Sequence, residues 1–267
     1  MTYSPDFSNI DNLVKSLKIL IVESGVKALL RRQEGLRVYY KEDRSPVTNA
    51  DLEISTLIYN HLKSLTPNLS VICEERELIC PLVDDVFWLV DPIDGTRSYI
   101  QNGDTFTVNI ALIKNNIAVL GFIYQPSLQK LYYTDYDNSL KIEQNGVVIS
   151  ADHTSQNDRY GAVVGSRYSD SNTKDFLKKH SITKIASIPS SVKLCLIAEG
   201  KADVYPMFGT TMEWDIAAGH ALIKAGGGNI VDLLGNELSY KKVGFQNPHF
   251  YAYSKYWYRK TDLKDNS

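Results

Sequence analysis

Cysteine and histidine are scarce in this chain, and neither occurs at a spacing typical of a metal site. The three cysteines are Cys73, Cys80 and Cys195, an odd number without a CxxC pair. We therefore expect free thiols in a reducing compartment, buried as packing residues rather than used as nucleophiles. The five histidines form no HExxH or HxH motif, which argues against a zinc site.

The sequence also lacks a long apolar run and a strong excess of either charge. No stretch approaches the roughly 18 apolar residues of a membrane span, and the first residues, MTYSPDFSNIDNLVK, do not resemble a signal peptide. The 29 basic residues are balanced by 31 acidic ones, so no positive field suits a nucleic-acid backbone. We expect a cytoplasmic protein without a transmembrane segment whose partners include no nucleic-acid polymer.

The first half of the chain combines two helical patterns with a series of strands. An apolar stripe predicts a helix over about residues 8–33, and a second helix begins after a cap at Thr48 or Asn49, with Asp51 in its first turn. From residue 105 to residue 150, strand patterns alternate with Asn-Asn, Pro-Ser, Asp-Asn and Asn-Gly turns. This pattern predicts an antiparallel meander.

After about residue 150 the pattern changes to strands and helices in alternation, which is typical of a layered α/β lobe. We therefore predict an α+β lobe over residues 1–150, carrying most of the candidate ligands, and an α/β lobe over residues 151–267. The C-terminal segment YAYSKYWYRK is interpreted as an edge strand with a solvated tail. Peripheral contact of this segment with a membrane surface or a partner stays open as an alternative.

Acidic side chains follow the ends of predicted strands and open a predicted helix. Glu74 and Glu75 follow LSVIC, Asp91 and Asp94 flank the end of VFWLV, and Asp215 stands in MEWDIAAG. Gathered in one place these carboxylates would repel each other, so bound cations are expected. Oxygen ligands alone favour hard ions, above all Mg²⁺. Each piece also has a common structural interpretation: a solvated Glu pair, an Asp-Gly turn or a helix cap.

The motif DPIDGT, residues 91–96, joins metal-ligand and anion-binding features. Pro92 fixes the backbone, so that both aspartates and the Ile93 carbonyl can face neighbouring metals. Gly95 permits a tight turn, and its N–H and that of Thr96 can face an anion if a helix begins there. The motif therefore predicts that metal and phosphate meet at this turn.

Four signatures occur in order along the chain: Glu74-Glu75, DPIDGT, Trp214-Asp215 with Ala217-Ala218, and AGGG. Together they resemble the inositol monophosphatase family of lithium-sensitive, Mg²⁺-dependent phosphatases, over essentially the whole chain. The segment SSVKLCLIAEGKADVYP, running into EWDIAAGHA, resembles the CysQ-type branch of 3'(2'),5'-bisphosphate nucleotidases. The resemblance implies an α/β fold, a layered αβαβα sandwich of the inositol monophosphatase and fructose-1,6-bisphosphatase type.

The resemblance also implies a site for two or three Mg²⁺ ions. It places one ion between Glu74, Asp91 and the carbonyl of Ile93. It places a second between Asp91, Asp94 and Asp215. A third ion, held partly by Glu74, would carry the attacking water.

The catalytic pair implied by the resemblance is Asp51 with Thr96, which would activate that water. A carboxylate linked through a hydroxyl can take up its proton. The implied reaction is direct in-line hydrolysis of a phosphomonoester, with the phosphate held by the Gly95 and Thr96 amides.

The implied substrate is adenosine 3',5'-bisphosphate, which the branch converts to AMP, with hydrolysis of 3'-phosphoadenosine 5'-phosphosulfate as a further activity. Ser190 and Lys193 match the branch's nucleotide-binding residues, and Asp215 borders the substrate. Two positions depart from the branch: Met207 stands where arginine is common, and Ser169 where histidine is frequent.

Two alternatives remain open at this stage. An inositol or sugar monophosphatase would keep the same metal site without a cation for a second phosphate, and Met207 favours it slightly. A non-catalytic, metal-binding regulatory protein would keep the fold without turnover. The sequence leaves the oligomeric state undecided.

Overall fold

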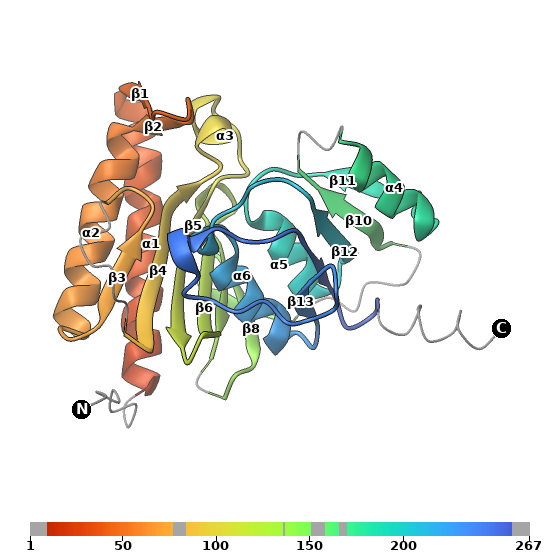
Figure 1. Cartoon of the computed structure of the whole chain (residues 1–267). Helices are drawn as coiled ribbons and strands as arrows, with labels where there is room; N and C mark the ends of the chain where they lie inside the picture. Colours follow the sequence, from red (N-terminus) through yellow and green to blue (C-terminus); the bar gives the residue numbers. More distant parts are fainter. Residues whose placement is uncertain (1–9, 77–83, 136, 151–157, 166–169, 258–267) are drawn as a thin grey trace.

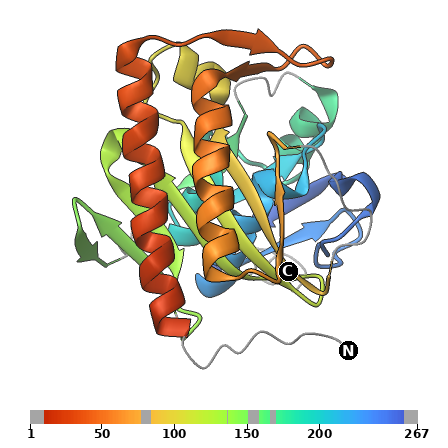
Figure 2. The same ribbon diagram turned by 90° about the vertical axis from the view of Figure 1, so that its left-hand side faces the viewer.

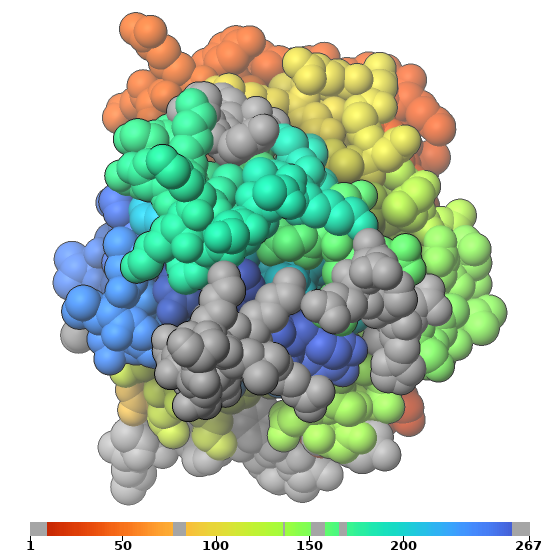
Figure 3. Space-filling model, turned by 90° about the vertical axis from the view of Figure 1, so that its right-hand side faces the viewer, coloured from red at the N-terminus to blue at the C-terminus, as the bar shows by residue number. Residues whose placement is uncertain are grey.

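The computed structural model describes residues 10–76, 84–135, 137–150, 158–165 and 170–257. Its elements form five layers (Figure 1). The helices α1 (Ile10–Glu34) and α2 (Asn49–Leu65) cover the outer face of a seven-stranded sheet, and α5 (Val192–Glu199) and α6 (Glu213–Ala225) lie between this sheet and a five-stranded one. On the far side of the second sheet lies α4 (Ser171–Lys179), which Figure 3 shows at the molecular surface. The predicted αβαβα sandwich is confirmed.

The first sheet is the predicted meander preceded by one parallel pair. Its order is β3-β4-β5-β6-β7-β8-β9, in which only β3 and β4 run parallel. The strands are β3 (Ser70–Cys73), β4 (Val86–Asp94), β5 (Thr107–Lys114), β6 (Ile117–Gln125), β7 (Lys130–Thr134), β8 (Leu140–Gln144) and β9 (Val147–Ile149). Strand β4 runs beyond VFWLV into the DPID motif, with a register shift between Asp91 and Asp94.

The second sheet has the order β11-β10-β12-β14-β13. Its strands are β10 (Tyr160–Val164), β11 (Ile185–Ser187), β12 (Ala202–Met207), β13 (Asn229–Asp232) and β14 (Phe250–Tyr253). The expectation of a C-terminal edge strand is wrong, because β14 pairs with β12 on one side and β13 on the other. The physical reason is burial: Phe250 and Ala252 are fully buried, so this strand belongs in the sheet interior. The remainder of the predicted tail, residues 258–267, lies outside the described residues.

A short hairpin, β1–β2, and a short helix, α3, lie near the helical layer and border the site described below. Figure 2 shows α1 and α2 side by side over the first sheet, with the antiparallel hairpin of β1 (Val38–Tyr40) and β2 (Pro46–Thr48) extending beyond the end of α2. The short helix α3 (Thr96–Ile100) follows β4 directly, and 3-10 turns occur at Pro126–Leu128 and Val243–Phe245. No helix within the described residues is long and apolar enough to span a membrane.

Strand β4 is central to the core because it is buried on both faces. Every residue from Val86 to Ile93 is buried, which explains the continuous apolar run of its first half. One apolar cluster packs β4 against α1 and α2, and another packs the opposite face of the sheet against α5 and α6. Gly121 permits this second contact, since a Cβ there would lie 2.2 Å from the Ala218 carbonyl oxygen of α6.

All strands of the first sheet precede residue 150, and all strands of the second follow it. Helix α6 nevertheless packs on β5 and β6, so the two parts of the chain share a core. The division into lobes 1–150 and 151–267 therefore stays a prediction.

Candidate active site

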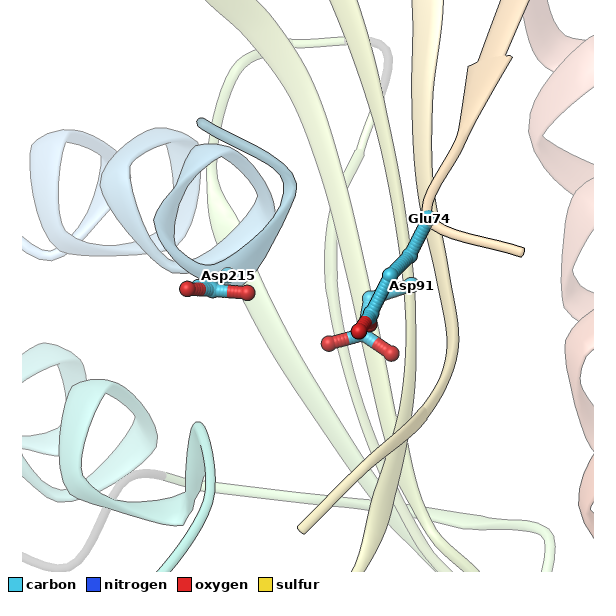
Figure 4. Close-up of side chains that lie close together, drawn as sticks. All are labelled: Glu74, Asp91 and Asp215. Carbon is cyan, nitrogen blue, oxygen red and sulfur yellow. The ribbon is translucent and has the colours of Figure 1, made fainter. Parts of the chain in front are cut away.

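Three of the predicted carboxylates converge between the sheet and α6 (Figure 4). Glu74 follows β3, Asp91 lies on β4, and Asp215 lies in the first turn of α6. The parallel pairing of Cys73 with Val90 sets Glu74 beside Asp91, while α6 directs Asp215 at them from the opposite side. One oxygen from each carboxylate lies within 4.8 Å of the others.

This cluster has the properties of a divalent-cation site. Asp91 is 2% exposed, and its Oδ1 has no hydrogen-bond partner among the described residues. Burial raises the pKa of Asp91 well above its usual range, and the charges of Glu74 and Asp94 raise it further. Burial also raises the pKa of Asp215, whose Oδ2 accepts a hydrogen bond of 2.7 Å from the Met212 N–H. A buried carboxylate oxygen without a donor, in an all-oxygen set, fits a hard cation such as Mg²⁺.

Two further predicted ligands lie at the end of β4, beside the cluster. Asp94 is half-buried, and its Oδ2 accepts a hydrogen bond from the Ser191 N–H. Burial raises the Asp94 pKa, and the Lys193 charge opposes that rise. The Ile93 carbonyl accepts a bond of 3.0 Å from the Thr96 hydroxyl, so a cation at that oxygen would share it with Thr96.

The structure brings Asp51 and Thr96 together, the two residues that the family resemblance pairs. The Thr96 hydroxyl lies 3.4 Å from Asp51 Oδ1. The other Asp51 oxygen accepts bonds from the N–H and the hydroxyl of Thr48, the N-cap of α2, in a capping box. Asp51 is 1% exposed, and burial raises its pKa to about 6 despite the Thr48 hydrogen bonds.

The turn after β4 has the predicted geometry for close approach. Gly95 has φ +86°, a left-handed conformation that favours glycine, and α3 begins at Thr96. A Cβ on Gly95 would lie 3.0 Å from the Ser190 Cβ. The absence of a side chain at Gly95 therefore lets the turn and the segment before α5 meet.

A cavity of about 800 Å³ opens beside these residues. On its α5 side, Lys193 is 8% exposed and donates a bond of 2.6 Å to the Ser190 carbonyl. Burial lowers the Lys193 pKa, opposed by the charges of Asp94 and Asp215. Met207 lines the same cavity, and its Sδ accepts a hydrogen bond of 3.3 Å from the Tyr205 hydroxyl. Ser169 lies outside the described residues.

Sequence reasoning missed Lys41, in the loop of the β1–β2 hairpin. Its ammonium donates to Glu74 Oε1 at 2.8 Å and to Glu75 Oε1 at 2.7 Å. Burial alone would lower the pKa of Lys41, but the two glutamates outweigh it and the pKa is raised. Burial and the Glu74 charge raise the pKa of Glu75 to about 7. No spacing or motif in the hairpin indicates this contact, which depends on tertiary folding.

Comparison with known proteins identifies the family of the chain. The model of the inositol monophosphatase family matches residues 9–260. The chain is 37% identical over 233 residues to the 3'(2'),5'-bisphosphate nucleotidase CysQ of Buchnera aphidicola, covering 85% of this chain and 87% of that protein. It is 39% identical over 221 residues to the protein of the same name in Escherichia coli K12, covering 80% of this chain and 87% of that protein.

Solved structures show the same relationship. CysQ from Bacteroides thetaiotaomicron superimposes with a TM-score of 0.75 at 29% identity, covering 92% of this chain and 98% of that one. An IMPase of Thermotoga maritima shares the fold with a TM-score of 0.75 at 24% identity, covering 95% and 96%. With a family match over nearly the whole chain and these relatives, the chain belongs to the inositol monophosphatase family.

Proposed function

We propose that the chain is a Mg²⁺-dependent 3'(2'),5'-bisphosphate nucleotidase. It hydrolyses the 3'-phosphate of adenosine 3',5'-bisphosphate to give AMP and phosphate, and converts 3'-phosphoadenosine 5'-phosphosulfate to adenosine 5'-phosphosulfate by the same step. The observation that carries the proposal is the cluster of Glu74, Asp91 and Asp215, in which Asp91 is buried while Glu74 and Asp215 line the same cavity as Lys193. Curated relatives at 32–40% identity, named as such nucleotidases, support the substrate.

The acidic cluster is the proposed site of two or three Mg²⁺ ions. Glu74, Asp91 and the Ile93 carbonyl would hold one, and Asp91, Asp94 and Asp215 another. When bound, such ions supply positive charge for the developing oxyanions and lower the pKa of water. The unpartnered Oδ1 of Asp91 supports this assignment, because a buried carboxylate oxygen normally has a donor.

The proton of the attacking water passes to the chain's own residues. The Thr96 hydroxyl, which donates to the Ile93 carbonyl at 3.0 Å in this structure, would turn its proton to Asp51 Oδ1, 3.4 Å away, as it accepts the proton of the water. With a pKa of about 6, Asp51 is mostly ionised at neutral pH and can accept the proton. The water oxygen forms its bond to phosphorus as the bond to the ribose 3'-oxygen breaks. That oxygen takes up a proton from solvent water as it leaves, which gives the hydroxyl of AMP, and Asp51 returns the proton it accepted to solvent.

Each side of the cavity is the proposed binding site of one phosphate of the substrate. The N–H groups of Gly95 and Thr96 hold the phosphate that is transferred. On the α5 side, the Lys193 ammonium is the proposed partner of the second phosphate. Ser190 lines the cavity beside it as a proposed nucleotide contact, with its hydroxyl donating to the Thr105 carbonyl. Lys193 is held close to this site, since its Nζ also lies 5.3 Å from the Tyr205 ring centroid.

One observation favours a second candidate, an inositol or sugar monophosphatase. Met207 places a thioether, not a cation, on the cavity wall near Lys193. A non-catalytic, metal-binding role is opposed by the presence of all the required acids and of the Asp51–Thr96 contact.

The test is phosphate release in Mg²⁺ from adenosine 3',5'-bisphosphate, inositol 1-phosphate and fructose 1,6-bisphosphate, with Asp91→Asn as the blank. Preference for the nucleotide, lost in Asp91→Asn, is expected. Preference for inositol 1-phosphate would establish the second candidate, and no release from any of the three would reject both.

A further inference from the structure

A buried polar cluster lies behind Asp94 in an otherwise apolar part of the sheet. It consists of Thr107 and Asn109 on β5 and Ser191, the residue before α5; their exposed fractions are 0%, 1% and 3%. Across the β4–β5 ladder, Asn109 pairs with Asp91 and Thr107 pairs with Asp94. The two polar residues of β5 thus stand directly opposite the two aspartates of β4.

The donor and the acceptor can be assigned in each of the hydrogen bonds that join this cluster to Asp94. The Ser191 hydroxyl donates to Asn109 Oδ1 at 2.9 Å. Because a hydroxyl has a single proton, the contact of 2.7 Å between Ser191 Oγ and Thr107 Oγ1 must have Thr107 as its donor. The backbone N–H of Ser191 donates in turn to Asp94 Oδ2. The chain of donors therefore anchors Ser191 to β5 while its N–H holds the Asp94 carboxylate.

The backbone next to Ser191 is strained in a way that needs this anchoring. Ser190 has φ +57°, a left-handed conformation that is uncommon for residues with a side chain. Such conformations persist where surrounding contacts hold them. Here the Ser190 hydroxyl donates to the carbonyl of Thr105, two residues before β5, and the Ser191 hydroxyl bonds to Thr107 on β5, so the strained residue and the one after it are both held at the start of this strand.

We propose that Thr107, Asn109 and Ser191 are positioning residues that preset Asp94 for divalent-cation binding. The inference rests on the proposed function, in which Asp94 is a Mg²⁺ ligand. Since Lys193 lies in the first turn of α5, two residues after Ser191, the cluster also sets the distance between the cation site and the proposed partner of the second phosphate.

The test compares Mg²⁺ binding in variants that delete one hydroxyl each. Thr107→Val removes the donor to Ser191 with little change in shape, Ser191→Ala removes the central hydroxyl, and Thr107→Ser keeps a donor. Thr134→Val is the matched control, because Thr134 is also buried in the first sheet, where its hydroxyl accepts from the Gly121 N–H at 3.0 Å. Isothermal titration calorimetry with Mg²⁺ alone gives the dissociation constant without requiring turnover.

We expect Thr107→Val and Ser191→Ala to weaken Mg²⁺ binding about tenfold or more, the usual effect of losing support for a metal ligand. Thr107→Ser is expected to bind near the wild-type value, and Thr134→Val to lower thermal stability without changing Mg²⁺ affinity. At saturating Mg²⁺, the kcat of Thr107→Val should return closer to the wild-type value than its KM does.

Unchanged Mg²⁺ affinity in folded Thr107→Val or Ser191→Ala would overturn the inference, and so would an equal loss in Thr134→Val. The outcome is separable from the proposed function. A wild-type protein that binds Mg²⁺ but hydrolyses no phosphoester would reject the function, while weaker Mg²⁺ binding by the variants would still support the positioning role.

Discussion

The two sides of the cavity are built on different principles. On the side of the first sheet, acidic residues come from strand ends and helix starts, and neighbouring carboxylates face each other within 4.8 Å. On the side of α5 and β12, one buried lysine stands beside an apolar wall that includes Met207. Under the proposed function, the first side would carry out the phosphate chemistry, whereas the second side would select which phosphoester is accepted.

The strongest way to break the first side is Asp91→Asn. Asp91 is the proposed ligand shared by two ions, so we expect kcat/KM to fall roughly 10³-fold. In EDTA the same variant should unfold at a higher temperature than the wild type, because neutralising one member of a crowded carboxylate cluster relieves repulsion. Phosphate-release kinetics and thermal unfolding measure the two effects. Activity within tenfold of the wild type would contradict the assignment.

The proton path on the first side predicts a smaller but still large effect. Thr96→Val and Asp51→Asn should each reduce kcat about 10²-fold or more, the range of a lost general base. Because Asp51 must be ionised, wild-type kcat/KM should decline as the pH falls below a midpoint at or under about 6, since nearby cations lower this pKa. A pH–rate profile of Asp51→Asn that keeps the same acidic limb would contradict the role of Asp51.

The second side should respond in substrate choice rather than in chemistry. Loss of a charge-assisted contact in Lys193→Met should raise KM for adenosine 3',5'-bisphosphate about 10–100-fold. KM for inositol 1-phosphate should change less. Met207→Arg, which adds a cation to the same wall, should lower KM for the bisphosphate several-fold. Steady-state kinetics with both substrates test the two variants. Equal changes in KM for the two substrates would show that this side of the cavity does not discriminate between them.

Substitution of a buried residue in the shared core should change the stability of the protein and not its substrate choice or chemistry. His220 of α6 is fully buried between the Tyr240 hydroxyl at 2.8 Å and Asn229 Oδ1 at 2.9 Å. Burial lowers its pKa to about 4, so the folded state keeps the imidazole neutral while the unfolded chain protonates near pH 6.5.

The His220 contribution is therefore full above about pH 6.5 and is lost as the pH falls toward 4, by at most roughly 3 kcal/mol. Chemical denaturation between pH 4 and 7 measures it, with His220→Gln expected to flatten that part of the profile. If the unfolding free energy of His220→Gln depends on pH between 4 and 7 as steeply as that of the wild type, His220 is not the source of this pH dependence.

Local signals predicted much of the fold and of the first side of the cavity. Periodicity and turn residues predicted the helices and the meander, and the compact DPIDGT motif predicted where the carboxylates lie, because Pro92 and Gly95 restrict the backbone locally. The position of β14 was missed, since strand order depends on pairing between distant segments. Lys41 and the cluster of Thr107 and Ser191 were also missed, because their partners lie 33 or more residues away and isolated polar residues have no periodic pattern.

The most direct test of the account is the identity of the product formed from adenosine 3',5'-bisphosphate. Phosphorus NMR of a reaction in Mg²⁺ distinguishes the two phosphates of the nucleotide and follows both products at once. The account predicts AMP and phosphate in equal amounts, with the reaction stopping when EDTA is added. Formation of adenosine 3'-phosphate, or no phosphate release while inositol 1-phosphate is hydrolysed, would contradict it.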